Sequence, residues 1–199
     1  MCPKDCVFSQ SPRNVSTARQ ITKEDIFYYV YGILHSPKYR ETFANDLKKS
    51  LPRIPLVEKA EDFWAFSRAG RELGALHVNY ETGNMSDDVT VIGAESGNYI
   101  VKKMKFDKDK RILYYNSDIR IENIPLEVDE YIVNGRSALG WLVDQYQVST
   151  DKASGIVNDP NDWAREHDYP RYILDLVLRI IELSVRTVEI VKGLPDLAV

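Results

Sequence analysis

The chain has 199 residues, of which 44% are hydrophobic and 28% charged, and its formal net charge is −4. This composition is typical of a globular protein with one sizeable core, which excludes an intrinsically disordered chain. The mild negative charge argues against a histone-like protein, but a local basic surface remains compatible with it.

The N-terminal residues carry no targeting or metal-binding signal. Residues 1–20 are poor in apolar groups, which predicts a flexible tail or linker, and they contain no hydrophobic signal region. No run of about 18 apolar residues occurs in the chain, so we expect no membrane span and a cytoplasmic location. Cys2 and Cys6 have no neighbouring histidine or third cysteine, which favours free thiols over a metal site.

Two helices are expected between Ile21 and Pro55. Thr22 and Asp25 have the spacing of a capping box, which predicts the start of the first helix. Ser36-Pro37 predicts its end, because proline suits the first position of a following helix. The expected buried stripe of the first helix contains Ile26, Val30, Ile33 and Leu34, and that of the second contains Tyr39, Phe43 and Leu47.

A third helix is predicted from Glu58 to Tyr80. Its apolar face comprises Phe63, Phe66, Gly70, Leu73 and His77. Because His77 lies on this face, a hydrogen-bonded core histidine is favoured over a ligand. Residues 21–81 are therefore interpreted as a helical support.

Short runs of β-type residues follow, in residues 82–133, and predict a mainly antiparallel meander. The expected strands are Val89–Ile92, Tyr99–Phe106, Arg111–Tyr115 and Ile119–Glu122, with Val128–Val133 as a further candidate. Asp107–Lys110 reads as a hairpin-like loop. Alternation predicts one buried face, with Ile100, Met104 and Phe106, and one basic face, with Lys103 and Lys105.

Residues 134–195 are expected to be mostly helical. A helix is predicted from Ser137 to Gln147, a loop from Ser149 to Asn161, and a long helix from Pro170 to Val191 that is apolar over much of its girth. The fold class is therefore α+β: three N-terminal helices and a long C-terminal helix pack with a small antiparallel meander.

Enzyme signatures are missing from the sequence. It contains no GxGxxG unit, no P-loop, no nucleophile-elbow serine and no HExxH pair, so we predict no catalytic residue, no cofactor and no metal. Asn158–Trp163 superficially resembles the acidic-Pro-Pro-aromatic loop of amino-methyltransferases but lacks the second proline, which favours a structural loop. Asp87, Asp88, Asp107 and Asp109 fall in predicted turns, where solvated carboxylates are common.

The positive feature is the basic segment Lys102–Arg111. Its six basic residues and two aspartates give +4 over ten residues. Two interpretations stay open: a surface for phosphates, or an edge strand that lysines protect against aggregation. Asn116 and Arg120 follow, and these residue types make bidentate bonds to adenine and guanine edges.

Several stretches resemble a known family. Asp25–Pro37 (DIFYYVYGILHSP), Leu51–Pro55 and Thr150–Asn161 (TDKASGIVNDPN) resemble the C-terminal target recognition, or specificity, domain of Type ISP restriction-modification enzymes and related single-chain enzymes. The resemblance covers residues 21–195. It implies that an N6-adenine methyltransferase precedes this domain in one polypeptide with helicase/nuclease parts, and that this chain is not an enzyme by itself.

Within this resemblance, His35 and Arg40 recur in the family pattern, and we favour a structural role for them. They lie at a predicted helix end, where a cation complements the helix dipole.

The implied partner is double-stranded DNA, and residue chemistry suggests how it is bound. Residues 21–80 would dock on the methyltransferase, while the meander and residues 136–152 would enter the major groove. Predicted phosphate contacts are Lys102, Lys103, Lys105, Lys108, Lys110 and Lys152, and predicted base readers are Arg111, Asn116, Arg120 and Arg136. The alternative is a protein–protein docking module without base reading, which salt dependence would distinguish.

Overall fold

The computed structural model describes residues 20–197, so the predicted tail lies almost entirely outside the described residues. Helix α1 (Lys23–His35) begins with the predicted capping box: the Thr22 hydroxyl accepts a hydrogen bond from the Asp25 amide at 3.2 Å, and the Asp25 carboxylate accepts from the Thr22 amide at 3.1 Å. Helix α2 (Pro37–Thr42) starts at its predicted cap, Ser36, and is shorter than expected.

Helices α1 and α3 (Ala60–Val78) cross closely, because glycines meet at the crossing. A Cβ atom on Gly32 would lie 2.4 Å from the Phe66 carbonyl oxygen, and one on Gly70 would lie 1.9 Å from the Tyr28 carbonyl oxygen. The buried face of α1 is consequently Tyr29, Gly32 and Ile33, and the prediction that Ile26 is buried is wrong, since its side chain is 52% exposed. The apolar face predicted for α3 is confirmed from Phe63 to Leu73.

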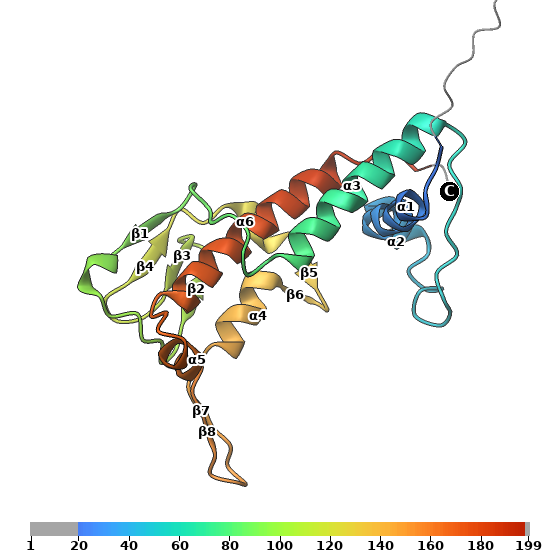
Figure 1. Ribbon diagram of the computed structural model, residues 1–199. Coiled ribbons are helices and arrows are strands. Elements are labelled where there is room, and N and C mark those ends of the chain that lie inside the picture. Colours follow the sequence, from blue (N-terminus) through green and yellow to red (C-terminus); the bar gives the residue numbers. More distant parts are fainter. Residues whose placement is uncertain (1–19, 198–199) are drawn as a thin grey trace, which may run out of the picture.

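The sheet contains a meander with one strand added out of sequence order. Its strands are β1 (Thr90–Ile92), β2 (Lys105–Asp107), β3 (Ile112–Tyr114) and β4 (Arg120–Glu122). All pairs are antiparallel and the order is β1-β4-β3-β2. The predicted meander is confirmed for β2, β3 and β4, whereas β1 lies on the outer side of β4 (Figure 1). A short 3-10 turn, η1 (Ala94–Ser96), follows β1.

The segment before β2 is irregular, which corrects the predicted strand Tyr99–Phe106. Val101 and Met104 are buried, while Ile100 is 54% exposed. The alternation expected from Ile100 to Phe106 therefore fails at its first residue. The reason is a tertiary contact, because the buried side chain of Asn161 bonds both the amide and the carbonyl of Val101, at 2.9 and 2.7 Å, where a strand would pair.

A two-stranded hairpin replaces the last predicted strand of the meander. Val128 lies in the 3-10 turn η2 (Leu126–Asp129), and β5 (Ile132–Val133) pairs with β6 (Arg136–Ser137). The turn between them is Asn134-Gly135, whose φ angles of 49° and 84° suit these two residue types. Helix α4 (Ala138–Gln145) then starts at Ser137, as predicted.

The main core lies between the sheet, α4 and α6 (Tyr172–Lys192). It includes Leu113, Ile121, Leu139 and Val177, all without exposed surface. Past this core α6 runs beside α3, as Figure 1 shows, and the two helices are tied by His77–Thr187 and Arg186–Glu72 contacts. The long helix is thus covered on two sides, as predicted. No helix within residues 20–197 is long and apolar enough to cross a bilayer.

The predicted loop Ser149–Asn161 contains structure that the sequence did not indicate. Strands β7 (Ser149–Thr150) and β8 (Val157–Asn158) form a hairpin that projects from the body of the molecule (Figure 1). The short helix α5 (Asn161–Glu166) follows and leads into α6.

Candidate nucleic-acid interface

The outward face of the sheet carries a row of polar side chains. Lys105 on β2 lies opposite Tyr114 on β3, and Tyr114 lies opposite Arg120 on β4. Opposed residues share a face, with Cβ atoms about 5 Å apart. The neighbouring row, Phe106–Leu113–Ile121, faces the core. All three residues of the outward row are exposed at the surface, Tyr114 by 37%.

The five lysines of the basic segment are all exposed, along the approach to β2, on β2 itself and in the β2–β3 loop. Lys108 pairs with Asp129 at 3.0 Å and Lys110 with Asp107 at 3.8 Å, while no ion pair involves Lys102, Lys103 or Lys105 within the described residues. Because β2 is an edge strand, edge protection and phosphate binding are both compatible with this arrangement.

Arg111 differs from these lysines, because its side chain turns inward and is only 17% exposed. Its Nε donates to the Ile124 carbonyl at 2.8 Å, and its two terminal nitrogens bond Asp129 and the Pro125 carbonyl. Its backbone has a φ of 55°, in the left-handed region. These contacts join the start of β3 to η2. The guanidinium group that was predicted to read a base therefore donates to acceptors of the protein itself.

The side chain of Asn116 is likewise occupied by backbone groups, both in its own turn and in the segment before β2. Its amide nitrogen donates to the carbonyls of Asn98 and Ile100, at 2.7 and 3.1 Å. Its amide oxygen accepts from the backbone amides of Asp118 and Ile119, at 2.9 and 2.8 Å. The amide group that could bond an adenine edge therefore joins the β3–β4 turn to the segment before β2.

Arg120 and Arg136 keep more of their surface. Arg120 donates through Nε to Glu122 at 2.6 Å, and within the described residues no bond of its terminal nitrogens is recorded. Arg136 lies on the β5–β6 hairpin, with its guanidinium 5.2 Å from the centre of the Trp141 ring and in an ion pair with Asp144. The structure therefore groups Arg120 with the lysines, while Arg136 belongs to a separate hairpin.

Lys152 lies on the projecting β7–β8 hairpin, whose base is linked to the basic segment. The Val148 amide donates to the Lys102 carbonyl at 2.9 Å. The hairpin exposes Ile156 by 62% and Val157 by 58%. These two residues were missed in the sequence, because a loop dense in turn residues gave no strand signal.

The Asn158–Trp163 loop is a structural element, as predicted. The Asn161 side chain is buried and bonds the backbone of Val101. Asp159 accepts hydrogen bonds from Arg165 at 2.7 Å and from the Asn161 amide at 2.9 Å. The loop thus fixes the approach to β2 against the start of α5.

A partly buried polar cluster joins α1, α3 and α6 to Tyr131, which lies between η2 and β5. His77 bonds the Tyr31 hydroxyl at 2.7 Å, the Thr187 hydroxyl at 3.2 Å and the Tyr131 hydroxyl at 3.3 Å. Burial, with a smaller effect of His35, lowers the pKa of His77 to about 4. The predicted hydrogen bonding of His77 is confirmed, and its side chain is half-buried. Burial also lowers the pKa of His35, so the expected cation at the end of α1 is wrong at neutral pH.

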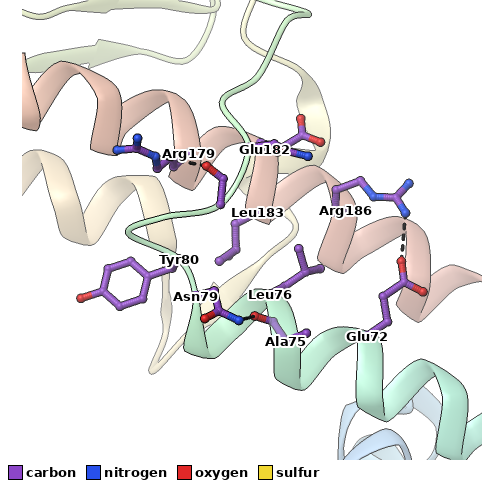
Figure 2. Close-up of a pocket in the computed structure, with 11 residues that line it drawn as sticks. Glu72, Ala75, Leu76, Asn79, Tyr80, Arg179, Glu182, Leu183 and Arg186 are labelled. Carbon is purple, nitrogen blue, oxygen red and sulfur yellow. Dashed lines mark hydrogen bonds and ion pairs between the residues drawn. The ribbon is translucent and has the colours of Figure 1, made fainter.

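A cavity of about 290 Å³ lies between α3 and α6 (Figure 2). Both of its arginines are bonded within the fold: Arg186 bonds Glu72 at 3.0 Å, and Arg179 donates to the Gly83 carbonyl at 3.2 Å. Glu182 also lines the cavity, and burial raises the pKa of its carboxyl group. Across residues 20–197 no three His, Cys, Asp or Glu side chains are placed to hold a metal. The cavity therefore offers no nucleophile with a base and no metal-ligand set.

The family model of the Type ISP C-terminal specificity domain matches residues 7–176. The chain belongs to this family. Specificity domains are the parts of these restriction-modification enzymes that recognise target DNA. The match includes the sheet, the basic segment and the β5–β6 and β7–β8 hairpins, and it ends inside α6.

Solved structures agree with this assignment. A nuclease-deletion mutant of the Type ISP restriction-modification enzyme LlaGI, in complex with a DNA substrate mimic, is 48% identical, with a TM-score of 0.79 over 88% of this chain and 16% of that chain. The ATP-dependent Type ISP enzyme LlaBIII, bound to DNA, is 43% identical, with a TM-score of 0.80 over 92% of this chain and 12% of that chain. A DrdV–DNA complex is 30% identical, with a TM-score of 0.70 over 88% of this chain and 18% of that chain. No match was found among curated proteins.

This specificity domain thus spans a small part of each solved chain. LlaGI and LlaBIII are Type ISP restriction-modification enzymes solved with DNA or a DNA mimic, and the family resemblance seen in the sequence is confirmed.

Proposed function

We propose that this domain recognises a specific sequence in double-stranded DNA for a methyltransferase and for nuclease/translocase parts of the same polypeptide, and that it performs no catalysis itself. The observation that carries the proposal is the outward row Lys105–Tyr114–Arg120 beside the exposed lysines. The row is open to solvent, and its cations suit phosphates and base edges.

The contacts of the predicted site residues refine their proposed roles. Lysine side chains that reach solvent bind phosphate: Lys102, Lys103, Lys105, Lys108, Lys110 and Lys152. Arg120 and Arg136 remain the proposed base readers, since both are exposed. Arg111 and Asn116 act by positioning, because backbone groups of the domain occupy their hydrogen-bonding edges.

The division of labour within residues 21–195 is also part of the proposal. The helical support, residues 21–81, docks on the preceding methyltransferase, while residues 82–133 and 134–195 present the DNA-binding surface. An apolar groove of about 510 Å³ between α1 and the start of α3 supports the docking role. Ile26 and Phe27 remain 52% and 64% exposed on α1, an arrangement that a protein interface would cover.

The proposal is tested by selection from random duplexes. The 199-residue chain is incubated at low salt with a library of random double-stranded DNA, and retained duplexes are sequenced over several rounds. Enrichment of one sequence motif is expected, and Lys105→Glu with Arg120→Ala should abolish it. Retention of duplexes without any enriched motif, or no retention at all, would contradict base reading by this domain.

A domain exchange provides an independent test. In LlaGI the segment matching this chain is replaced by this chain. Adenine methylation is then mapped in DNA that has been incubated with the hybrid enzyme. We expect methylation at the motif that the selection enriches. Methylation at the original LlaGI site would show that specificity lies outside this domain.

The second candidate, a docking module without base reading, is favoured by the exposed apolar residues of α1. Its interface would be mostly apolar and therefore insensitive to salt, whereas phosphate binding weakens steeply as salt rises. Duplex binding that disappears with added salt supports recognition of DNA.

A further inference from the structure

The β7–β8 hairpin is the feature that the proposed base readers and phosphate lysines leave unexplained. Figure 1 shows it extending away from α5 and the sheet, with little of its length against other elements. Its turn is held from within. The Asp151 carboxylate accepts hydrogen bonds from the Ala153 amide at 3.1 Å, the Ser154 amide at 2.7 Å and the Ser154 hydroxyl at 2.8 Å. The projection is therefore an ordered ribbon.

The ribbon carries apolar side chains where no other described element covers them. Ile156 is 62% exposed and Val157 is 58% exposed, and Val148 at the base is 39% exposed. β-branched residues on a free hairpin leave apolar surface in water and create an exposed edge. A binding partner that covers them would remove this cost.

The polar groups of the ribbon point to the kind of partner. Its two carboxylates are already occupied, Asp151 by the turn and Asp159 by Arg165. The structure records no ion pair for Lys152 within residues 20–197. Ser149 lies opposite Asn158, and Thr150 lies opposite Val157, so the paired positions of the two strands carry two hydroxyl groups, one amide and one apolar side chain. Such a mixture matches the edges of bases, sugars and phosphates.

The base of the ribbon adjoins the basic segment, through the 2.9 Å bond from the Val148 amide to the Lys102 carbonyl. Lys102 and Lys103 are exposed at this junction. The ribbon therefore continues the surface to which DNA binding is assigned. The major groove of duplex DNA is about 12 Å wide and admits a two-stranded β-ribbon.

We propose that the β7–β8 hairpin enters a groove of the bound DNA, where Ile156 and Val157 contact base edges and sugars and Lys152 binds a phosphate. This inference rests on the proposed function and adds to it a distinct DNA-inserting element. The competing partner is another protein domain, for which DNA affinity would not depend on the hairpin.

The test uses the full 199-residue chain and a fluorescein-labelled duplex carrying the selected motif, with anisotropy measured between 50 and 200 mM salt. The double variant Ile156→Ser/Val157→Ser should bind about tenfold or more weakly, since two apolar side chains that the DNA would cover are lost. Its salt dependence should match that of the wild type, because no charge is removed. Lys152→Ala should lower the slope of log affinity against log salt by about 1.

The matched control is Leu51→Ser/Leu56→Ser, which removes two exposed leucines, 88% and 82% exposed, from the helical support. This variant should bind DNA like the wild type, and all variants should keep the wild-type melting temperature. If the wild type binds the duplex and the hairpin variant binds within about twofold of it, the hairpin does not enter DNA. If the wild type itself binds no duplex, the proposed function fails instead.

Discussion

Lys105 and Arg111 belong to one basic segment but face different surroundings, so their replacement should separate stability from DNA binding. Arg111→Ala removes hydrogen bonds to two carbonyls and to Asp129. Because these acceptors are partly buried, we expect the free energy of unfolding to fall by about 2–4 kcal/mol. Lys105→Ala should change stability by less than about 0.5 kcal/mol, since its side chain is exposed.

Urea denaturation and duplex binding, measured on the same preparations, check this prediction. Lys105→Ala should weaken DNA binding, whereas Arg111→Ala should bind normally under conditions in which it is folded. If Arg111→Ala kept the wild-type stability but lost selectivity at one base pair, Arg111 would be a base reader after all.

His77 should make stability depend on pH. Burial lowers its pKa from 6.5 to about 4 in the folded chain, with a smaller effect from His35. Between these values the unfolded chain binds a proton that the folded chain excludes, so stability is full above pH 6.5 and falls as pH decreases toward 4. One such proton can lower the free energy of unfolding by at most about 1.4 kcal/mol per pH unit, and partial exposure reduces this.

Urea denaturation at pH 7 and pH 5 measures the effect. His77→Gln, which keeps hydrogen-bonding groups for Tyr31 and Thr187, should lose much less stability between the two pH values than the wild type. The control His167→Gln alters a ring that is stacked on Trp163 at the surface, and it should retain the wild-type pH dependence. Equal pH dependence of all three proteins would exclude His77 as the source.

The residue types in the sequence indicated which hydrogen-bond donors could read bases, but not which of them bond the protein itself. The same donors that allow arginine and asparagine to read bases also bond backbone carbonyls. Arg111 and Asn116 differ from Arg120 only through neighbours brought together by folding, such as the carbonyls of Ile124 and Asn98. His77 was predictable because its position on an apolar helical face already indicated burial.

At the level of elements, the α1–α3 crossing depends on glycine. Gly70→Ala would place a Cβ atom 1.9 Å from the Tyr28 carbonyl oxygen and 2.8 Å from the Gly32 amide nitrogen. These neighbours are backbone atoms, so the helices must separate, and we expect the free energy of unfolding to fall by about 3 kcal/mol or more.

The control for this crossing is Gly74→Ala, one turn along the same helix, where the nearest atom is a side-chain carbon of Tyr28 at 3.0 Å. The tyrosine ring can shift, and alanine favours the helix by about 1 kcal/mol relative to glycine, so little stability should be lost. Chemical denaturation compares the two variants. Similar stabilities would show that the crossing tolerates a methyl group.

Elements with long periodic patterns could be predicted from the sequence, and short ones could not. The faces of α3 and α6 follow from apolar spacing over many residues. Strand β2 has three residues and β7 has two, too few for alternation to be recognised. Their positions are set by tertiary contacts, chiefly the bonds from Asn161 to Val101 and from Val148 to Lys102. The DNA-inserting hairpin was missed for this reason.

For the whole molecule, the α+β class followed from the order of helical and strand-like segments. The place of β1 beside β4 did not, because nothing local specifies which edge a three-residue strand joins. The local charge, by contrast, was recognised in the sequence as the basic segment, and the structure adds that this segment lies at an edge of the sheet. A net charge of −4 describes the chain, whereas the lysines near β2 form a local basic surface on one edge of the sheet.

Local charge, rather than net charge, should therefore control DNA affinity. With the six proposed phosphate contacts, affinity should fall roughly 1,000-fold between 50 and 200 mM salt. Lys103→Glu/Lys105→Glu and Lys48→Glu/Lys49→Glu change the net charge equally, but the first pair lies at β2 and the second on the helical support. Only the first should weaken duplex binding and lower the salt slope, as measured by anisotropy. Equal weakening by both pairs would mean that the field of the whole chain governs binding, since the two variants differ only in where the charge is placed.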